Sequence, residues 1–353
     1  MGSSLAALTT NLRKCDMGLF KETTKTFAGC DLSLVTQKSF YPYSYTCDWD
    51  RLEETKLPPK DAFFNELTES HIGQNDYDHA VRVWDYFKCK TLGEYSDIYL
   101  KIDTVILCDV FEAFRDLCMR TYKLDPCHYY TAPGLSFQSM LMYTGIELEL
   151  LSDYEMMLFF ERGIRGGMTF STMKYAKANN RKTPGYDPNK PDSWILYQDV
   201  NNLYGWSLSQ NMPHSGFQWL DEDPETSLRR LEDLDEKSPT GLVFEVDITY
   251  PKHLHDEHNE LPFLPETKCP PGSKIKKLLT TFDKKTNYVV HYLNLKQAIA
   301  NGLRVEKVHR VLKFNQSAWL APYIELNTKL RQKASNDFEK DFFKLMNNSV
   351  FGE

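Results

Sequence analysis

The segment Asp199-Val-Asn-Asn-Leu-Tyr-Gly205 carries residue types that suit a metal ion bound to a triphosphate. Residues 194–199 have the pattern of a short apolar strand, so Asp199 is expected at the edge of a sheet. Backbone N–H groups of the following turn point the same way, and Mg²⁺ prefers one or two carboxylates together with phosphate oxygens. The alternative is an ordinary strand-to-helix connection capped by Asn202, and spacing alone favours that alternative.

A second group of candidate site residues lies near the C-terminus. It comprises Lys340, Lys344, Asn348, Phe351 and Gly352, preceded by the basic residues Arg331 and Lys333. Steps of four residues put the first three on one face of a helix. The two ammonium groups can neutralise phosphate charge, and the aromatic residue with the following glycine lets a planar base pair approach. The alternative is an amphipathic helix with solvated lysines, which is the commoner situation for either lysine alone.

The elements expected in the first half are helices. Apolar residues recur at spacings of three and four in residues 78–87 and 98–122. Ser152-x-x-Glu155 is a capping-box pattern that predicts a helix running to Arg162. Glycines at 163, 166 and 167 end it, and the Pro-, Gly- and Asn-rich residues 180–193 read as a loop. We therefore expect a domain boundary between about 165 and 193.

Strands are expected after that loop. Residues 242–250 alternate between apolar and polar types and end at a proline, and 288–292 and 303–314 also favour strands. A short helix is expected between the last two, and a long helix from about 317 or 322 through 348. The fold class is thus α/β of the α+β kind, with a mostly helical first part and an antiparallel sheet after it.

Charge is divided unequally along the chain. The net charge of the 353 residues is −7. Residues 268–353 nevertheless carry 16 Lys and Arg against 7 Asp and Glu, so 26 of the 42 basic and 42 of the 49 acidic residues precede them. Such asymmetry is typical of a basic nucleic-acid surface beside an acidic region. Clustering on solvated helix faces gives the same pattern, and charge alone does not decide between them.

The remaining composition indicates an intracellular globular protein without a membrane partner. Eight cysteines are scattered with no C-x-x-C pair, which favours reduced thiols, and no apolar run reaches the roughly 20 residues that span a bilayer. The N-terminus lacks the pattern of a secretory signal. A zinc-stabilised structural domain is a weak alternative, because the spacings are unlike those of zinc sites and a solvated loop is the default. Its candidate ligands are His253, His255, His258 and Cys269.

Together these motifs resemble those of family B DNA polymerases. DVNNLYG is similar to motif A of that family, and KLMNNSVFG is similar to motif B. Ile164-Arg-Gly166-Gly167 resembles the motif that joins exonuclease and polymerase domains, and Tyr99-x-x-x-Asp103 resembles the third exonuclease motif. Each motif is weak by itself, but the four occur in the family order. The segments FYPYSY, LPPKDAFFNEL and HYYTAPGL are similar to the organellar, viral and Maverick/Polinton-type group, which includes protein-primed enzymes.

The resemblance implies a role for each matching residue. Asp199, helped by the Val200 carbonyl, would bind two Mg²⁺ or Mn²⁺ ions, and Asp103 would bind a metal beside Tyr99, which orients the attacking water of a 3′–5′ exonuclease. The nucleotide would be bound by Leu203, Tyr204, Lys340, Lys344, Asn348 and Phe351. DNA would contact Ile164, Gly166, Gly167, Arg331 and Lys333. The implied partners are primer-template DNA and deoxynucleoside triphosphates, and the segment at about 253–315 lies where protein-primed relatives hold a terminal protein.

The resemblance also implies a division into domains and an incomplete catalytic set. It implies the C-terminal part of an RNase H-like exonuclease domain at 1–163, a linker at 164–193, a palm at 194–315 and a fingers helix at 316–353. The upstream exonuclease motifs and the Y-x-D-T-D-S sequence of motif C are absent, so we expect the 353 residues alone to lack appreciable activity. The alternative function is a non-catalytic DNA-binding remnant of a transposon or virus. The sequence leaves open whether the primer is a protein or a nucleic acid.

Overall fold

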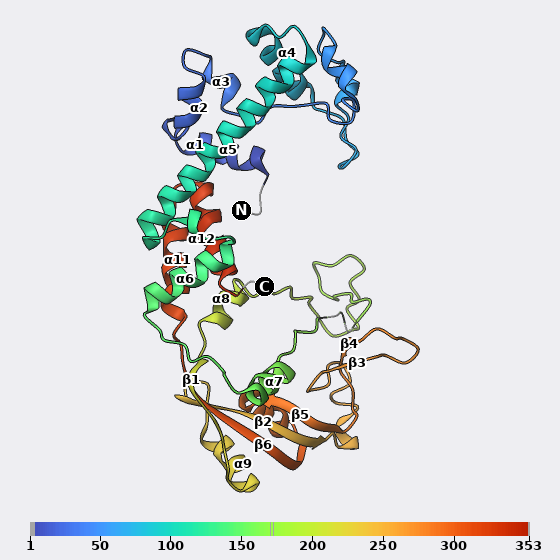
Figure 1. Ribbon diagram of the computed structural model, residues 1–353. Helices are drawn as coiled ribbons and strands as arrows, with labels where there is room; N and C mark the ends of the chain where they lie inside the picture. The colour runs from blue at the N-terminus through green and yellow to red at the C-terminus, as the bar shows by residue number, and fades with distance from the viewer. Residues whose placement is uncertain (1–3, 170, 172, 352–353) are drawn as a thin grey trace. The chain divides into compact units, whose positions relative to one another are not determined.

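Two compact units make up the chain. The computed structural model describes residues 4–169, 171 and 173–351 (Figure 1). One unit combines the chain up to Tyr143 with the chain from Tyr323 onward, and the other contains Thr144–Pro322. The expected boundary between 165 and 193 lies inside the second unit, because Phe159 packs against the sheet of that unit. The last helices belong with the first ones. Residues 1–3, Gly352 at the end of the motif B resemblance, and Glu353 lie outside the described residues.

The first unit is helical. Its helices are α1 (Leu5–Cys15), α2 (Lys21–Thr26), α3 (Leu32–Val35), α4 (Gln74–Phe87), α5 (Leu92–Tyr122), α6 (Ala132–Thr144), α11 (Ala321–Lys333) and α12 (Asp337–Ser349). Short 3-10 turns lie at Met17–Leu19, Trp49–Glu53, Lys60–Phe63 and Pro126–His128. The expected helices at 78–87 and 98–122 are confirmed as α4 and α5. Neither α5, with 31 residues, nor any other helix of the described chain is apolar over a length that would cross a bilayer.

Helix α5 forms the centre of this unit. It buries a stripe of residues at helical spacing, and Phe114 and Tyr122 meet Phe342 of α12 with ring centroids 5.5 and 6.0 Å apart. Ser136 of α6 donates to the Met346 carbonyl at 2.6 Å, so the two stretches of chain share one core. The expected long helix at 317–348 is wrong in one respect. It is divided into α11 and α12, and the Asn336 side chain caps the second helix by accepting from the Glu339 N–H.

The second unit is built on an antiparallel sheet of strand order β1-β6-β2-β5. The strands are β1 (Met212–Trp219), β2 (Thr240–Thr249), β5 (Lys285–His291) and β6 (Arg304–Ser317), and β3 (Glu266–Lys268) pairs with β4 (Lys277–Leu279) in a separate ribbon. Helices α7 (Tyr154–Gly163), α8 (Leu203–Leu208), α9 (Pro224–Asp233) and α10 (Tyr292–Ala300), with a 3-10 turn at Lys252–Leu254, complete the unit. The predicted strands at 242–250, 288–292 and 303–314 and the helix between the last two are confirmed.

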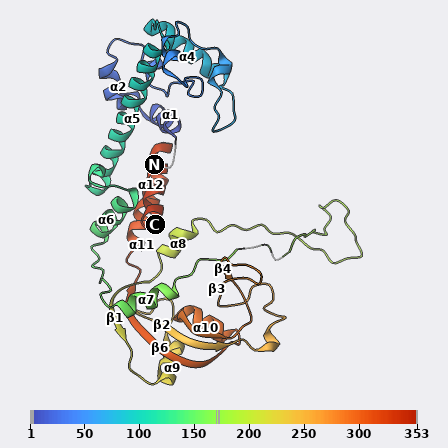
Figure 2. The same cartoon turned by 45° about the vertical axis from the view of Figure 1, so that its right-hand side comes forward.

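The two faces of the sheet are covered differently. Leu242, Phe244, Val246 and Ile248 point to one face and pack with α9 and α10, the latter visible against the strands in Figure 2. The intervening residues of β2 point to the other face, where Val243 packs against Phe159 of α7. This alternation is the two-residue period of a strand. Helix α7 is capped by Asp153, which accepts from Glu155 N–H at 2.7 Å, so the predicted cap at Ser152 is one residue too early.

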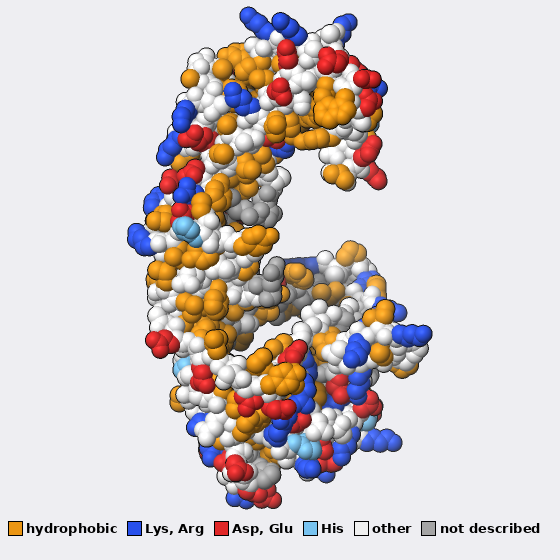
Figure 3. Space-filling model, in the orientation of Figure 1, with side chains coloured by type: hydrophobic (Ala, Val, Ile, Leu, Met, Phe, Trp, Pro, Cys, Tyr) orange, Lys and Arg blue, Asp and Glu red, His pale blue; other side chains and the backbone are white. Residues whose placement is uncertain are grey.

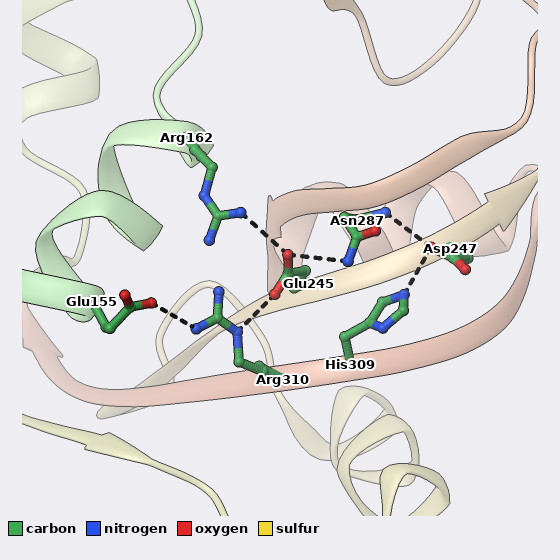
Figure 4. A network of polar contacts seen from close by, with 7 residues as sticks. All are labelled: Glu155, Arg162, Glu245, Asp247, Asn287, His309 and Arg310. Carbon is green, nitrogen blue, oxygen red and sulfur yellow. Dashed lines mark hydrogen bonds and ion pairs between the residues drawn. The ribbon is translucent and has the colours of Figure 1, made fainter.

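Charged groups join α7 to the sheet (Figure 4). The side chain of Glu245 is only 5% exposed, and it accepts from Arg310 Nε at 2.8 Å and from Arg162 of α7 at 3.3 Å. Two residues on, Asp247 accepts from the Asn287 N–H at 2.9 Å and lies 2.8 Å from His309 Nε2. A buried carboxylate needs such partners, because burying an unpaired charge is costly.

The predicted strand at 194–199 is not formed. Residues 191–200 have no regular secondary structure, and Trp194 through Val200 are all exposed. An apolar strand is stable only when a neighbouring strand satisfies its backbone and a core covers its side chains. Within the described residues this segment has neither.

Candidate functional site

The helix α12 presents one polar face and one apolar face. Lys340, Lys344 and Asn348 are exposed at spacings of four, while Phe342 and Met346 between them are buried. The structure therefore brings the first three together on one side, as their spacing predicts. Lys340 also forms an exposed 3.3 Å ion pair with Asp337. The basic residues Arg331 and Lys333 lie in the last turn of α11 and are exposed, and Phe351 follows α12 and is 48% exposed.

The turn after Asp199 has the tight geometry that the sequence predicts. Asn202 has φ 55°, a left-handed conformation that asparagine tolerates better than most residues, and α8 begins at Leu203 with Tyr204 in its first turn. A Cβ atom on Gly205 would lie 2.3 Å from Asn202 Nδ2, so a larger residue there would require the Asn202 side chain to move. Asp199 and Val200 precede the turn and are exposed.

The residues expected to hold the nucleotide belong to different units. Asp199, Val200, Leu203 and Tyr204 lie in the unit Thr144–Pro322, whereas Lys340, Lys344, Asn348 and Phe351 lie in the other. Each set is assembled within its own unit. That the two sets meet around one nucleotide stays a prediction.

The other predicted pair, Tyr99 and Asp103, lies on one face of α5. Lys38 joins them by donating to Tyr99 Oη at 3.0 Å and to Asp103 Oδ2 at 2.8 Å. Tyr43 forms a further hydrogen bond with Tyr99 Oη. Burial and that hydrogen bond raise the pKa of Tyr99, so its hydroxyl stays protonated and can act as a donor.

Lys38 and Tyr43 were missed by reasoning from the sequence. Neither belongs to a recognisable short motif, since they approach Tyr99 only through the path of the chain before α4. One signal was present in the aromatic segment FYPYSY, which follows Lys38 directly. That segment packs against α5, where Tyr95 donates to the Phe40 carbonyl at 2.6 Å and Tyr41 lies 5.2 Å from the Tyr99 ring.

The predicted metal-binding residues fit a cation only in part. Asp103 has one carboxylate oxygen held by Lys38, and its Oδ1 is buried without a hydrogen-bond partner among the described residues, so that oxygen suits a metal ion. Asp199 offers a second, exposed carboxylate. Nowhere in the described residues are three His, Cys, Asp or Glu side chains close enough together to hold a metal ion. Asp103 and Asp199 would therefore each provide one ligand of the sites that the resemblance implies.

The glycine-rich segment after α7 is anchored by its arginine. Arg165 stacks on Tyr288 at 4.0 Å and donates to the Val289 carbonyl at 2.7 Å, and burial lowers the pKa of its guanidinium. By contrast Ile164 is 78% exposed, and a Cβ on Gly166 or Gly167 would meet nothing within 4 Å. The backbone predicted to contact DNA thus has open space beside it. This segment borders a cavity of about 460 Å³ together with the 261–265 loop.

The histidines considered for zinc have aromatic neighbours. His255 stacks on Phe282 with centroids 4.2 Å apart, and His258 Nδ1 lies 2.6 Å from Tyr250 Oη.

On the face shown in Figure 3, Lys and Arg side chains are interspersed with Asp and Glu. That face shows no continuous basic patch.

The chain is similar to some solved structures at low sequence identity. No curated protein matches the chain. Among solved structures, the phi29 DNA polymerase in an orthorhombic crystal form has a TM-score of 0.44 at 13% identity, covering 89% of this chain and 47% of its own. The phi29 polymerase complexed with primer-template DNA and incoming nucleotides has a TM-score of 0.42 at 15% identity, with the same coverage. The chain thus spans about half the length of these polymerases.

A family model decides the assignment, because it covers far more than half of the chain. The model describes type B DNA polymerases of organellar and viral origin, and it matches residues 37–353. The match includes the cluster around Tyr99, the glycine-rich segment, the turn after Asp199 and the basic face of α12. The chain belongs to the organellar and viral family of type B DNA polymerases.

Proposed function

We propose that this chain binds an incoming deoxynucleoside triphosphate on primer-template DNA, as part of a polymerase that adds nucleotides to a primer 3′ end. The observation that carries the proposal is the exposed face of α12, where Lys340, Lys344 and Asn348 stand in line. Ammonium groups in this arrangement neutralise triphosphate charge, and an amide beside them can hydrogen-bond the nucleotide. The same proposal gives Asp199, before the turn at Asn202, the task of providing a carboxylate for the metal ions.

Each residue has a separate task in this proposal. Two Mg²⁺ ions, when bound, supply the charge that activates the primer oxygen and stabilises the leaving pyrophosphate. Asp199 provides one carboxylate ligand, and the Tyr204 ring excludes a ribose 2′-hydroxyl. Lys344 holds the triphosphate, and Phe351 offers its ring to the nascent base pair.

A second candidate function is 3′–5′ hydrolysis of DNA, favoured by the cluster of Lys38, Tyr43, Tyr99 and Asp103. Lys38 positions Tyr99 and Asp103 together, and the protonated Tyr99 hydroxyl can orient a water molecule. The unpaired Asp103 Oδ1 suits a divalent cation. Further acidic groups are needed for hydrolysis, as for synthesis.

The test separates binding from turnover. With the purified 353-residue chain, we expect Lys344→Ala to weaken binding of a fluorescent deoxynucleoside triphosphate by about tenfold, since a charge-assisted contact is lost. Asp199→Asn should remove the dependence of that binding on Mn²⁺. The matched control is Lys329→Ala, which removes an exposed lysine of α11 that pairs with Glu325.

Turnover is expected to be absent. The 353 residues include one of the two expected polymerase carboxylates, so labelled primer-template should be neither extended nor shortened with Mg²⁺. Equal nucleotide affinity of Lys344→Ala and Lys329→Ala would contradict the proposed binding site. Templated extension that depends on Asp199 would contradict the expected inactivity.

A further inference from the structure

Residues 179–193 form a closed loop that its own polar side chains hold in shape. The Asn179 Nδ2 group donates to the carbonyl oxygens of Asp187, Lys190 and Pro191 at 3.0, 3.3 and 3.2 Å. Asn179 Oδ1 accepts from the Asp187 N–H at 2.9 Å. One side chain therefore contacts four backbone groups on the opposite side of the loop, with the two amide hydrogens shared among three carbonyl oxygens.

The two ends of this loop are tied together in the same way. Ser193 donates its N–H to the Asn179 carbonyl at 2.7 Å, and its own carbonyl accepts from Asn180 Nδ2 at 3.0 Å. The buried Asn180 side chain also accepts from the Lys182 N–H at 2.9 Å, and Thr183 Oγ1 accepts from the Asn180 N–H at 2.9 Å. Compact surface loops with such close ends are frequently functional. The loop thus has a fixed shape before any partner binds.

The outward surface of the loop and its two arms is basic and aromatic. The basic side chains of residues 174–197 are all exposed, and they are Lys174, Lys177, Arg181, Lys182 and Lys190. The two acidic ones are the exposed Asp192 and the half-buried Asp187, which lies 3.6 Å from the Lys190 ammonium. Aromatic rings stand among them, with Tyr175, Trp194 and Tyr197 exposed by 76, 65 and 90%. The Lys182 ammonium lies 5.9 Å from the Trp194 ring centroid. Figure 2 shows the loop at the end of its two extended arms.

We propose that residues 174–197, which we call the basic loop, are a binding surface for single-stranded DNA. Lysines and Arg181 attract the phosphates, and the exposed rings of Trp194 and its neighbours stack on bases. Bases in a duplex are already stacked on each other, so exposed aromatic rings favour an unpaired strand. The choice of DNA rests on the proposed polymerase function, while the charge and the aromatic rings are independent of it.

The experiment compares two triple variants of the full chain with equal charge change. One is Lys177→Gln, Arg181→Gln, Lys182→Gln in the basic loop, and the control is Arg229→Gln, Lys237→Gln, Lys252→Gln at exposed positions elsewhere in the same unit. Affinity for a fluorescein-labelled single-stranded oligonucleotide is measured by anisotropy at several salt concentrations. Each phosphate contact makes the slope of log affinity against log salt concentration steeper by about 0.7. The slope of the loop variant should therefore be shallower by about 2. The control variant should keep it.

A single variant tests the aromatic part separately. Trp194→Leu should weaken single-strand binding by about tenfold without changing the salt slope, and should leave duplex binding unchanged. Circular dichroism of every variant checks that the fold is kept, and the side chains exchanged are exposed.

Several results would overturn the proposal. They are equal losses of affinity in the loop and control variants, a Trp194→Leu variant that binds the single strand normally, or an acidic peptide that competes as well as the oligonucleotide. The proposed nucleotide site is tested separately, by measuring how tightly the Lys344→Ala variant binds the deoxynucleoside triphosphate. Either proposal can therefore fail while the other stands.

Discussion

His79 in α4 is a buried titratable group whose environment favours the neutral ring. It is 2% exposed, and its Nδ1 lies 2.6 Å from Gln37 Nε2, which can only donate. Burial, with the nearby cations Arg82 and Arg13, lowers the pKa of His79 to about 4. An unfolded histidine has a pKa near 6.5, so the folded state disfavours protonation. This contribution to stability is complete above about pH 6.5 and is lost as pH falls toward 4.

The first prediction at the residue scale follows from this shift. Between pH 7 and 4, the free energy of unfolding should fall by roughly 3 kcal/mol through this group, and His79→Phe should remove that part of the fall. Urea denaturation at successive pH values measures it. The control is His253→Phe, at an exposed position. Parallel pH profiles of His79→Phe and the unchanged chain would show that another group is responsible.

At the same scale, residue types and their spacing predicted local geometry better than they predicted contacts between residues far apart in the sequence. The spacing of Lys340, Lys344 and Asn348 was enough to place them on one helix face, and the turn around Asn202 followed from its motif. Lys38 could not be found this way, because its contact with Asp103 spans 65 positions of sequence. Such pairs are set by how the chain packs, which spacing does not encode.

At the scale of elements, the attachment of α7 to the sheet depends on a buried carboxylate. Arg310→Met should lower the free energy of unfolding by roughly 2–3 kcal/mol, because Glu245 would lose its closest partner and keep, among the described residues, the weaker contacts with Arg162 and Asn287. In the double variant Glu245→Leu, Arg310→Met the loss should be smaller, since no buried charge remains unpaired. Chemical denaturation of both variants and of Glu245→Leu completes the cycle. Strictly additive losses would mean that the two side chains stabilise the unit independently.

Strands whose apolar face is buried by another element of the described chain were predictable from the sequence. A strand predicted where no described element covers it was wrong. The alternation in residues 242–248 identified β2, because one face of that strand is buried by α10. Residues 194–199 have an equally apolar pattern, but no layer of the described residues covers them, so the predicted strand was wrong. The break between α11 and α12 was also missed. Asn336-x-x-Glu339 is a capping signal within an otherwise helical pattern.

At the scale of the whole molecule, the two units differ in how the chain builds them. Thr144–Pro322 is continuous in sequence, whereas the helical unit needs both the N-terminal residues and α11–α12. The change from helical to strand-like patterns in the sequence suggested a boundary near the glycine-rich segment. Return of the last helices to the first ones depends on long-range packing such as the contact between Phe114 and Phe342, which no local pattern reveals.

This difference predicts how fragments behave. Residues 144–322 expressed alone should unfold in one cooperative thermal transition, because the sheet and both of its covering layers lie within them. Residues 1–143 alone should lack a cooperative transition and bind a hydrophobic dye, because Phe114 and Tyr122 would lose Phe342, and the Ser136 hydroxyl would lose the Met346 carbonyl. Adding a peptide of residues 321–351 should restore cooperativity. A cooperative transition in residues 1–143 without the peptide would mean that α11 and α12 only cover a core that the N-terminal helices complete by themselves.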